Sequence, residues 1–434
     1  MKSLTSLTLG PLPKLRGTIR LPGSKSLSNR YLLLAALSTG STRLSGLLES
    51  DDTRAMRAAL RALGVGIREA GKDRSLEIDG IGSRGFQVPV DALDLGNAGT
   101  AMRPLAAALC ASWGDFVLDG VQRMRERPIG DLVDGLRPIL AGGASIEYLG
   151  TPGFPPLAIH ARGFRGGRTR IKGTTSSQFL TGLLLAAPLS TLPLEIEVEG
   201  ELISKPYVDI TIRLMERFGV PICRDGYRRF SIEPATYRSP GAIAVEGDAS
   251  SASYFLAFGA LGGPVRVEGC GTDSVQGDAA FAGVLEKMGA QVERGPDWIA
   301  CQSAPDGRLR GLAIDMVDMP DAAMTLATLA LFADGPTRIA GIGSWRVKET
   351  ERVVAVRDQL RKVGATVEEG PDWIRVIPPA QIRPTTIETY DDHRMAMAFS
   401  LVAAATETVI LDPDCTAKTF PGYFEALQRL SSPS

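Results

Sequence analysis

The chain has 434 residues, 44% of them hydrophobic, which is enough for two or three globular domains that each bury a sizeable core. Its 48 basic and 49 acidic residues nearly cancel, so the overall charge gives no reason to expect nucleic acid or a membrane surface as a partner. Any binding site for anions must therefore come from the local placement of charge.

The first residues of the chain lack the continuous apolar stretch of a signal peptide, and the longest apolar run, near Leu183, stops at Pro188. We therefore expect a cytoplasmic protein without an export signal or a membrane span. The five cysteines are odd in number and lack CxxC spacing, which is typical of reduced thiols rather than of a disulfide or zinc framework.

The first recognisable unit begins with a polar turn at residues 22–30, directly before an apolar helix that reaches Leu37. A strand at residues 41–44, a helix at residues 53–63 and a strand pair that ends near Ile78 follow. With a strand before the turn, the predicted order of elements is β-α-β-α-β-β.

Openings of the same kind, a small polar turn before an apolar helix, recur about every 70 to 80 residues. They begin at Leu95, Thr175, Gly247, Pro320 and Asp391. The strongest internal match joins residues 289–299 to residues 364–374, because both segments contain Gly-Ala followed by Gly-Pro-Asp-Trp-Ile. We therefore predict six copies of one unit.

The sixth copy ends after its second helix, so it lacks a closing strand pair, and we expect the strand at residues 4–9 to complete it. The predicted fold class is α/β, with two lobes of three βαβαββ units each. One lobe would contain residues 1–23 and 247–434, and the other residues 24–246. We expect the active site in the cleft between the lobes, where the positive ends of six helix dipoles would make the cleft electropositive.

The turn at residues 22–30 combines the N–H groups of a helix start with Lys25 and Arg30, which is the composition of an anion site. An ordinary serine cap is the alternative for this turn, and caps or turns are the alternative for the polar residues at the other openings. The candidate residues at the openings are Lys25, Ser26, Arg30, Asn97, Gly99, Thr100, Arg103, Ser176, Ser177, Gln178, Asp321, His393 and Arg394.

Basic side chains also occur in equivalent loops of three copies, at residues 123–128, 344–352 and 416–419. Solvent exposure is the alternative for each loop taken alone, and a packed role is the alternative for His393. The sequence contains no metal-ligand cluster, no Ser-His-Asp triad and no Gly-rich nucleotide motif. We therefore expect a pocket for small anions that works without a metal or cofactor and uses Lys, Glu and Asp as acids and bases.

Together these stretches resemble the 5-enolpyruvylshikimate-3-phosphate (EPSP) synthase family in its bacterial, glyphosate-sensitive form. The resemblance extends over all six copies, and the fold of that family, an inside-out α/β barrel of two lobes with three βαβαββ units each, agrees with the repeats. The matching segments are residues 21–30, 95–104, 127–130, 176–180, 204–207, 247–252, 346–350, 392–397 and 417–421.

The resemblance implies transfer of the enolpyruvyl group of phosphoenolpyruvate to the 5-hydroxyl of shikimate 3-phosphate, with release of phosphate, in chorismate biosynthesis. These two small molecules would be the partners, with no nucleic acid, no membrane and no cofactor. We expect a monomer, because the sequence shows no convincing oligomer interface.

The resemblance also implies binding roles. Shikimate 3-phosphate would be bound by Lys25, Ser26, Arg30, Ser176, Ser177, Gln178, Ser204, Tyr207, Asp321 and Lys348. Phosphoenolpyruvate would be bound by Lys25, Asn97, Gly99, Arg127, Gln178, Arg352, Arg394 and Lys418. Planar guanidinium groups suit carboxylate and phosphate oxygens, which is a physical reason for several arginines around one small trianion.

By the same resemblance, Asp321 would accept the proton of the attacking hydroxyl and Glu349 would protonate the methylene carbon, with Lys25 assisting. A tetrahedral intermediate would form, and phosphate would leave by elimination. Glu349 must then hold a proton at neutral pH, so we expect partial burial to raise its pKa. Ser344 replaces an asparagine that is common in the family, whereas Gly99 matches, which predicts ordinary sensitivity to glyphosate.

Two other functions are open. The related UDP-N-acetylglucosamine enolpyruvyl transferases share the fold and the donor, but they use a cysteine in the loop that corresponds to residues 120–127, where this chain has none. Cys110 lies in an apolar helix and is expected in the core. A non-catalytic anion-binding protein would be expected to have lost part of the catalytic set, which is intact.

Overall fold

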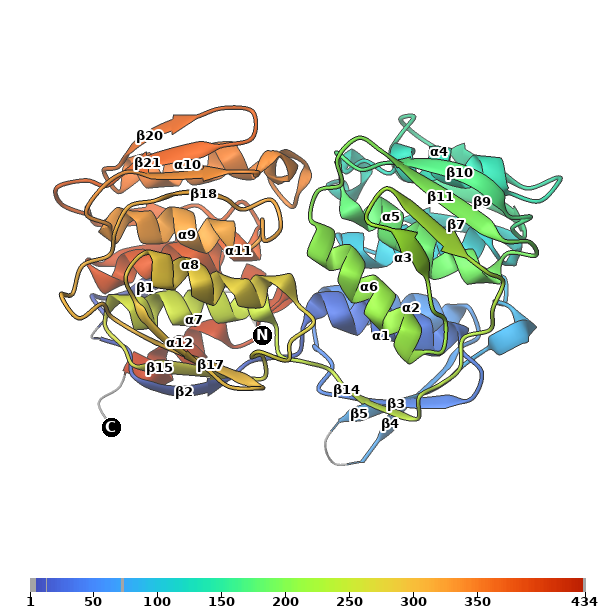
Figure 1. The fold of residues 1–434 in the computed structure, drawn as a ribbon, viewed down its shortest axis with the longest axis horizontal. Coiled ribbons are helices and arrows are strands. Elements are labelled where there is room, and N and C mark those ends of the chain that lie inside the picture. The colour runs from blue at the N-terminus through green and yellow to red at the C-terminus, as the bar shows by residue number, and fades with distance from the viewer. Residues whose placement is uncertain (1–4, 13, 72–73, 432–434) are drawn as a thin grey trace. The chain divides into compact units, whose positions relative to one another are not determined.

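The computed structural model describes residues 5–12, 14–71 and 74–431. The chain folds into two compact units (Figure 1). Unit 1 is formed by residues 1–22 and 246–434, and unit 2 by residues 23–245. The chain therefore begins in unit 1, passes through all of unit 2 and returns to unit 1.

Unit 2 contains three four-stranded sheets that share one strand order, in which a parallel pair is extended by two antiparallel strands. In sheet order, the strands are β14 (Ala242–Ala244), β3 (Ser41–Ser45), β5 (Ser75–Asp79) and β4 (Gly66–Ala70); β6 (Leu93–Asp94), β7 (Trp113–Asp119), β9 (Leu157–Arg162) and β8 (Ser145–Tyr148); and β10 (Gly167–Lys172), β11 (Leu194–Glu199), β13 (Arg229–Ile232) and β12 (Cys223–Asp225).

Two helices accompany each of these sheets, and the first of each pair forms the core of the unit. The helices are α1 (Lys25–Leu37), α2 (Asp51–Ala62), α3 (Gly99–Cys110), α4 (Gly130–Leu136), α5 (Ser177–Ala186) and α6 (Lys205–Arg217). Nearly every side chain of α1, α3 and α5 is buried, because these helices are apolar on most sides beyond their first turns, and Figure 1 shows them inside the sheets. The inside-out arrangement of helices within sheets is thus confirmed.

Unit 1 repeats this plan with two four-stranded sheets and one three-stranded sheet. In sheet order, the strands are β16 (Gln291–Arg294), β17 (Trp298–Gln302), β15 (Val265–Glu268) and β2 (Gly17–Arg20); β18 (Ala313–Asp315), β19 (Thr337–Ala340), β21 (Ile374–Ile377) and β20 (Thr366–Glu369); and β1 (Ser6–Leu9), β23 (Thr408–Leu411) and β22 (Thr385–Ile387). The helices are α7 (Ala249–Leu261), α8 (Phe281–Lys287), α9 (Ala323–Leu329), α10 (Arg352–Lys362), α11 (His393–Phe399) and α12 (Tyr423–Ser431).

Strand pairing at the ends of the two units differs from the chain order. Strand β2 directly precedes α1 but pairs in parallel with β15 of unit 1, where Ile19 lies opposite Val267. Strand β14 directly precedes α7 but pairs in parallel with β3 of unit 2, where Ile243 lies opposite Leu44. The first and fourth copies have therefore exchanged their first strands.

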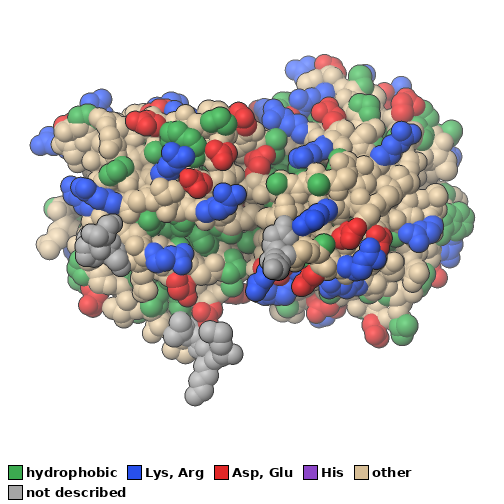
Figure 2. Space-filling model, turned by 90° about the horizontal axis from the view of Figure 1, so that it is seen from below, with side chains coloured by type: hydrophobic (Ala, Val, Ile, Leu, Met, Phe, Trp, Pro, Cys, Tyr) green, Lys and Arg blue, Asp and Glu red, His purple; other side chains and the backbone are tan. Residues whose placement is uncertain are grey.

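The sixth copy receives its missing strand from the start of the chain. Strand β1 pairs antiparallel with β23, with Leu7 opposite Ile410, and residue 4 of the predicted strand lies outside the described residues. Among the described helices, none combines the length and the apolar character that crossing a membrane requires. Figure 2 shows basic and acidic side chains interspersed on the face that it presents, as their nearly equal numbers lead one to expect.

Candidate active site

Five of the predicted site residues meet in one ion-pair network in unit 1. Asp321 lies just before α9, Lys348 and Glu349 precede α10, Arg352 is the first residue of α10 and Arg394 is the second residue of α11. Arg394 Nη2 is 2.9 Å from Asp321 Oδ2, while Arg352 Nη1 and Lys348 Nζ are 3.1 and 3.7 Å from Asp321 Oδ1. Three cations thus converge on one carboxylate.

Arg352 is almost completely buried among carboxylates, with 1% of its side chain exposed. Its Nε and Nη2 donate to Asp392 over 2.8 and 3.2 Å, and Nη2 is also 3.0 Å from Glu349 Oε2. Asp392 in addition accepts a hydrogen bond from the backbone N–H of Arg394 and so caps α11. The two-point contact with Asp392 fixes the plane of the Arg352 guanidinium.

The charges of this network determine the pKa values of its members. Burial alone would raise the pKa of Asp321, but Arg394, Lys348 and Arg352 outweigh burial and hold that pKa well below its usual range. Burial lowers the pKa of Lys348, although Asp321 opposes this effect. Glu349 lies against Arg352, with its Oε2 3.0 Å from Arg352 Nη2.

The backbone around α11 is strained at two neighbouring residues. Tyr390 and Asp391 have φ values of 56° and 54°, in the left-handed region that side chains other than glycine rarely adopt. They immediately precede Asp392 and Arg394. Strained backbone of this kind persists where the surroundings hold it in place, and it is frequent at functional sites.

Lys418 is the last residue of a 3₁₀ turn, residues 413–418, that packs on α11.

In unit 2, Arg30 is buried with neutral partners. Its Nε donates to Thr211 Oγ1 over 3.0 Å, its Nη1 donates to Ser26 Oγ, and its Nη2 donates to the Tyr207 carbonyl over 3.3 Å. Burial lowers the pKa of Arg30 to about 10, which leaves it charged at neutral pH. A buried guanidinium held by hydroxyl and carbonyl oxygens retains its charge for an anion.

Two more arginines of unit 2, Arg103 and Arg127, lie near the start of α3. Arg127 Nη1 donates to the backbone O and to Oδ1 of Asn97 over 3.0 and 2.9 Å. Arg103 donates to Gln178 Oε1 over 3.2 Å and to the Pro128 carbonyl over 2.9 Å. A Cβ at Gly99 would lie 2.8 Å from Arg127 Nη2 and in closer conflict with Arg103 Nη1. Only glycine therefore leaves both guanidinium groups in place.

Lys25 forms an ion pair that the sequence analysis did not identify. Its Nζ is 3.3 Å from Asp52 Oδ2, and both side chains are buried. Asp52 lies in α2, where an acidic residue in the first turn is usually explained by the helix dipole. The sequence therefore gave no separate reason to single it out.

The structure shows which of the polar residues before the helices act as side-chain caps. Ser176, Asp248 and Asp392 cap α5, α7 and α11 with their side chains, as the alternative interpretation predicts. Ser24, before α1, makes no such hydrogen bond. Ser204, before α6, has a φ of 54° and also makes no side-chain cap bond, so its left-handed backbone is not explained by capping.

The structure also shows which basic residues of the loop at residues 123–128 are exposed and how His393 is packed. Arg123 and Arg125 form surface ion pairs with Glu126 and Asp119, whereas Arg127 of the same loop is buried. His393 is fully buried, with Nδ1 3.7 Å from Asp392 Oδ1, which agrees with a packed role. The described residues contain no group of three or more His, Cys, Asp or Glu that could hold a metal ion.

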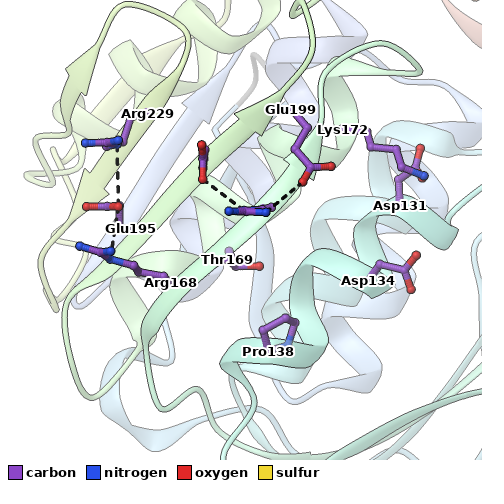
Figure 3. Close-up of a pocket in the computed structure, with 11 residues that line it drawn as sticks. Asp131, Asp134, Pro138, Arg168, Thr169, Lys172, Glu195, Glu199 and Arg229 are labelled. Carbon is purple, nitrogen blue, oxygen red and sulfur yellow. Dashed lines mark hydrogen bonds and ion pairs between the residues drawn. The ribbon is translucent and has the colours of Figure 1, made fainter.

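A groove of about 500 Å³ lies elsewhere in unit 2, over β10, β11 and β13, and contains none of the predicted site residues. Figure 3 shows its charged side chains paired with one another, with Glu195 between Arg168 and Arg229 at 3.4 and 3.8 Å. Across the same groove, Lys172 Nζ is 3.1 Å from Asp131 Oδ1. Its charges are therefore compensated by one another, across the sheet and between the sheet and α4.

Known proteins similar to this chain agree with the predicted family. The family model of EPSP synthase (3-phosphoshikimate 1-carboxyvinyltransferase) matches residues 10–427. A 3-phosphoshikimate 1-carboxyvinyltransferase of Laribacter hongkongensis is 57% identical over 428 residues, which cover 98% of this chain and 99% of the relative. A protein of the same name from Yersinia ruckeri is 57% identical over 431 residues, 99% of each chain.

Two solved structures share the fold. An EPSP synthase of Acinetobacter baumannii superposes with a TM-score of 0.80 at 27% identity and covers 98% of both chains. The enolpyruvyl transferase NikO of Streptomyces tendae superposes with a TM-score of 0.78 at 19% identity, over 99% of this chain and 98% of its own. The match of the family model and the 57% identity over nearly the full length lead to one conclusion: the chain belongs to the EPSP synthase family.

Proposed function

We propose that this protein transfers the enolpyruvyl group of phosphoenolpyruvate to the 5-hydroxyl of shikimate 3-phosphate and releases phosphate, a step of the shikimate pathway. The observation that carries this proposal is the network in which Asp321 and Glu349 share the cations of Lys348, Arg352 and Arg394. It combines an acid, a base and the charge that two polyanionic substrates require. The assigned names of the relatives support the same reaction.

The two substrates divide the buried cations between them. In our proposal shikimate 3-phosphate takes Arg30, whose guanidinium is held by neutral oxygens, together with Lys348 and the hydroxyl groups of the predicted set. The predicted hydroxyl residues are Ser26, Ser176, Ser177, Ser204 and Tyr207. Phosphoenolpyruvate takes the arginines and lysines of the second predicted set, which are Lys25, Arg127, Arg352, Arg394 and Lys418.

Asp321 acts as the base that removes the proton of the attacking hydroxyl. A carboxylate with a strongly lowered pKa is a weak base, and the three cations around Asp321 cause that lowering. Anionic substrates that bind Arg394 and Arg352 offset part of this positive charge. Substrate binding therefore raises the basicity of Asp321, so that the proton is accepted when the donor is in place.

Glu349 delivers a proton to the methylene carbon, with Lys25 assisting. The hydroxyl oxygen attacks the adjacent carbon of phosphoenolpyruvate to give a tetrahedral intermediate. The new methyl group then returns a proton to Glu349 as phosphate leaves, and the double bond is restored. Glu349 Oε2 is 3.0 Å from Nη2 of Arg352, one of the arginines proposed to bind phosphoenolpyruvate. Phosphoenolpyruvate bound to Arg352 therefore lies next to the acid that protonates it.

Phosphate release from phosphoenolpyruvate tests the proposed function. We expect turnover with shikimate 3-phosphate as acceptor, no turnover with UDP-N-acetylglucosamine, and the same rate without added metal. Turnover with the nucleotide sugar alone would contradict the proposal and favour the related transferase. No turnover with either acceptor would favour a binding protein on the same fold.

Three further properties complete the proposal. The protein is of the glyphosate-sensitive type, because Gly99 leaves room for the guanidinium groups beside it. It acts in the cytoplasm, and it acts as a monomer. Inhibition by glyphosate in competition with phosphoenolpyruvate, fractionation of the producing cells and sedimentation at two protein concentrations test these properties one by one.

A further inference from the structure

Tyr254 of α7 is fully buried and touches the ion-pair network through its hydroxyl group. Its Oη lies 3.2 Å from Nη1 of Arg394, although the two residues are 140 positions apart in the chain. The ring packs edge-on against Tyr423, with ring centres 5.9 Å apart. No motif of the sequence pointed to Tyr254, because it lies inside an apolar helix.

Arg394 is held at both ends of its guanidinium group. Nη1 donates to the Tyr254 hydroxyl, and Nη2 donates to Asp321 Oδ2 over 2.9 Å. A guanidinium is planar and rigid, so two partners on its two terminal nitrogens fix the direction of the whole group. Loss of the Tyr254 contact would remove one constraint on Nη1, and the group would turn more easily about its contact with Asp321.

The chemistry of the second partner matters as much as its position. Burial raises the pKa of Tyr254 to about 12, so its hydroxyl is neutral at physiological pH. A neutral acceptor orients Arg394 without cancelling its charge. A second carboxylate would orient the guanidinium too, but it would also cancel its charge. Arg394 therefore keeps charge for a substrate anion.

We infer that Tyr254 is a positioning residue, which orients the Arg394 guanidinium for the anionic groups of phosphoenolpyruvate. This inference rests on the proposed function, in which Arg394 binds that substrate. Tyr254 touches no substrate itself and acts through Arg394.

The substitution Tyr254→Phe removes the hydroxyl and keeps the ring. The matched control is Tyr423→Phe, because Tyr423 is an equally buried tyrosine of the same aromatic cluster. Its hydroxyl contacts Ser400 Oγ at 2.8 Å and the carbonyl of Met397, in the same helix as Arg394, at 3.3 Å. The control therefore loses a buried hydroxyl next to α11 without loss of the contact to the guanidinium.

We expect Tyr254→Phe to raise KM for phosphoenolpyruvate about tenfold, as the loss of one hydrogen bond to a charged group implies. KM for shikimate 3-phosphate and the melting temperature should change no more than in Tyr423→Phe. Equal KM values for phosphoenolpyruvate in the two variants would overturn the inference. Inactivity of the unaltered protein would instead overturn the proposed function, and with it the inference.

A double-mutant cycle with Arg394→Gln shows whether Tyr254 acts through Arg394. In the Arg394→Gln background, Tyr254→Phe should leave KM for phosphoenolpyruvate within about twofold of the single Arg394→Gln variant, because the group to be oriented is gone. An additive tenfold increase would show that Tyr254 acts by another route and would overturn the inference.

Discussion

The substitution Gly99→Ala is expected to displace two arginines at the start of α3. An alanine Cβ would lie 2.8 Å from Arg127 Nη2, whereas unstrained contacts between such atoms are about 3.5 Å or longer. Arg127 must therefore retreat by several tenths of an ångström from the position in which Asn97 holds it. Arg103 must move as well, because its Nη1 is closer still to the added atom.

Weakening one hydrogen bond of a charged donor costs about 1.5 kcal/mol, which corresponds to about a tenfold change in affinity. We therefore expect Gly99→Ala to raise KM for phosphoenolpyruvate about tenfold and to raise the inhibition constant of glyphosate at least as much. KM for shikimate 3-phosphate should change little. Steady-state kinetics with each substrate varied in turn measure all three quantities.

The control for this prediction is Gly142→Ala, because a Cβ at Gly142 meets no atom within 4 Å. An unchanged KM for phosphoenolpyruvate together with unchanged inhibition by glyphosate would refute the assignment of Gly99 and Arg127 to this substrate.

Three more substitutions, the last with a matched control, test charged residues of unit 1. Glu349→Gln should lower kcat at least about 100-fold because an amide cannot deliver the proton, and near-normal turnover would contradict its role as the acid. Burial, aided by the charge of Asp321, raises the pKa of Asp278 to about 6. Above about pH 6 the folded protein must therefore hold an unfavourable buried carboxylate, whereas below about pH 4 the carboxyl group is protonated in both the folded and the unfolded state and has no such cost. Urea unfolding should therefore find Asp278→Asn more stable than the unaltered protein by up to about 3 kcal/mol at pH 8 and equal to it near pH 4; a gain that does not depend on pH would exclude this cause. Asp392→Asn should lower the free energy of unfolding by about 3 kcal/mol, because it leaves Arg352 buried without its two-point partner. The control Glu368→Gln breaks an exposed ion pair and should lower it by less than about 1 kcal/mol. Equal losses in the two variants would contradict the structural argument.

Local sequence patterns were sufficient to predict the repeating unit. Apolar helices after polar turns are visible in the sequence, and α1, α3 and α7 begin within a few residues of the predicted openings. The predicted lobe bounds place β2 with residues 247–434 and β14 with residues 24–246, but the pairing of β2 with β15 and of β14 with β3 was not predicted, because both are short strands that fit either partner equally well in sequence. Which partner a strand meets depends on tertiary packing, and periodicity contains no information about it.

The cations of the candidate site were easier to predict than the residues that hold them. A lysine or arginine in a polar turn before an apolar helix is conspicuous, as Lys25 and Arg394 illustrate. Their partners are distant in sequence and ordinary in their own surroundings: Asp52 lies in the first turn of a helix, and Tyr254 lies inside another helix, 140 residues from Arg394. The roles of such residues become apparent only when the fold brings them to the charge.

The exchanged strand β2 has a consequence for biosynthesis. Ile19 pairs with Val267, so β2 is synthesised about 250 residues before its partner. At translation rates of about 5 to 20 residues per second, the start of the chain waits about 10 to 50 seconds, while the continuous unit 2 can already fold. We therefore expect ribosome-bound chains to acquire a protease-resistant unit 2 first, with the amino-terminal segment accessible to protease until the carboxy-terminal half emerges.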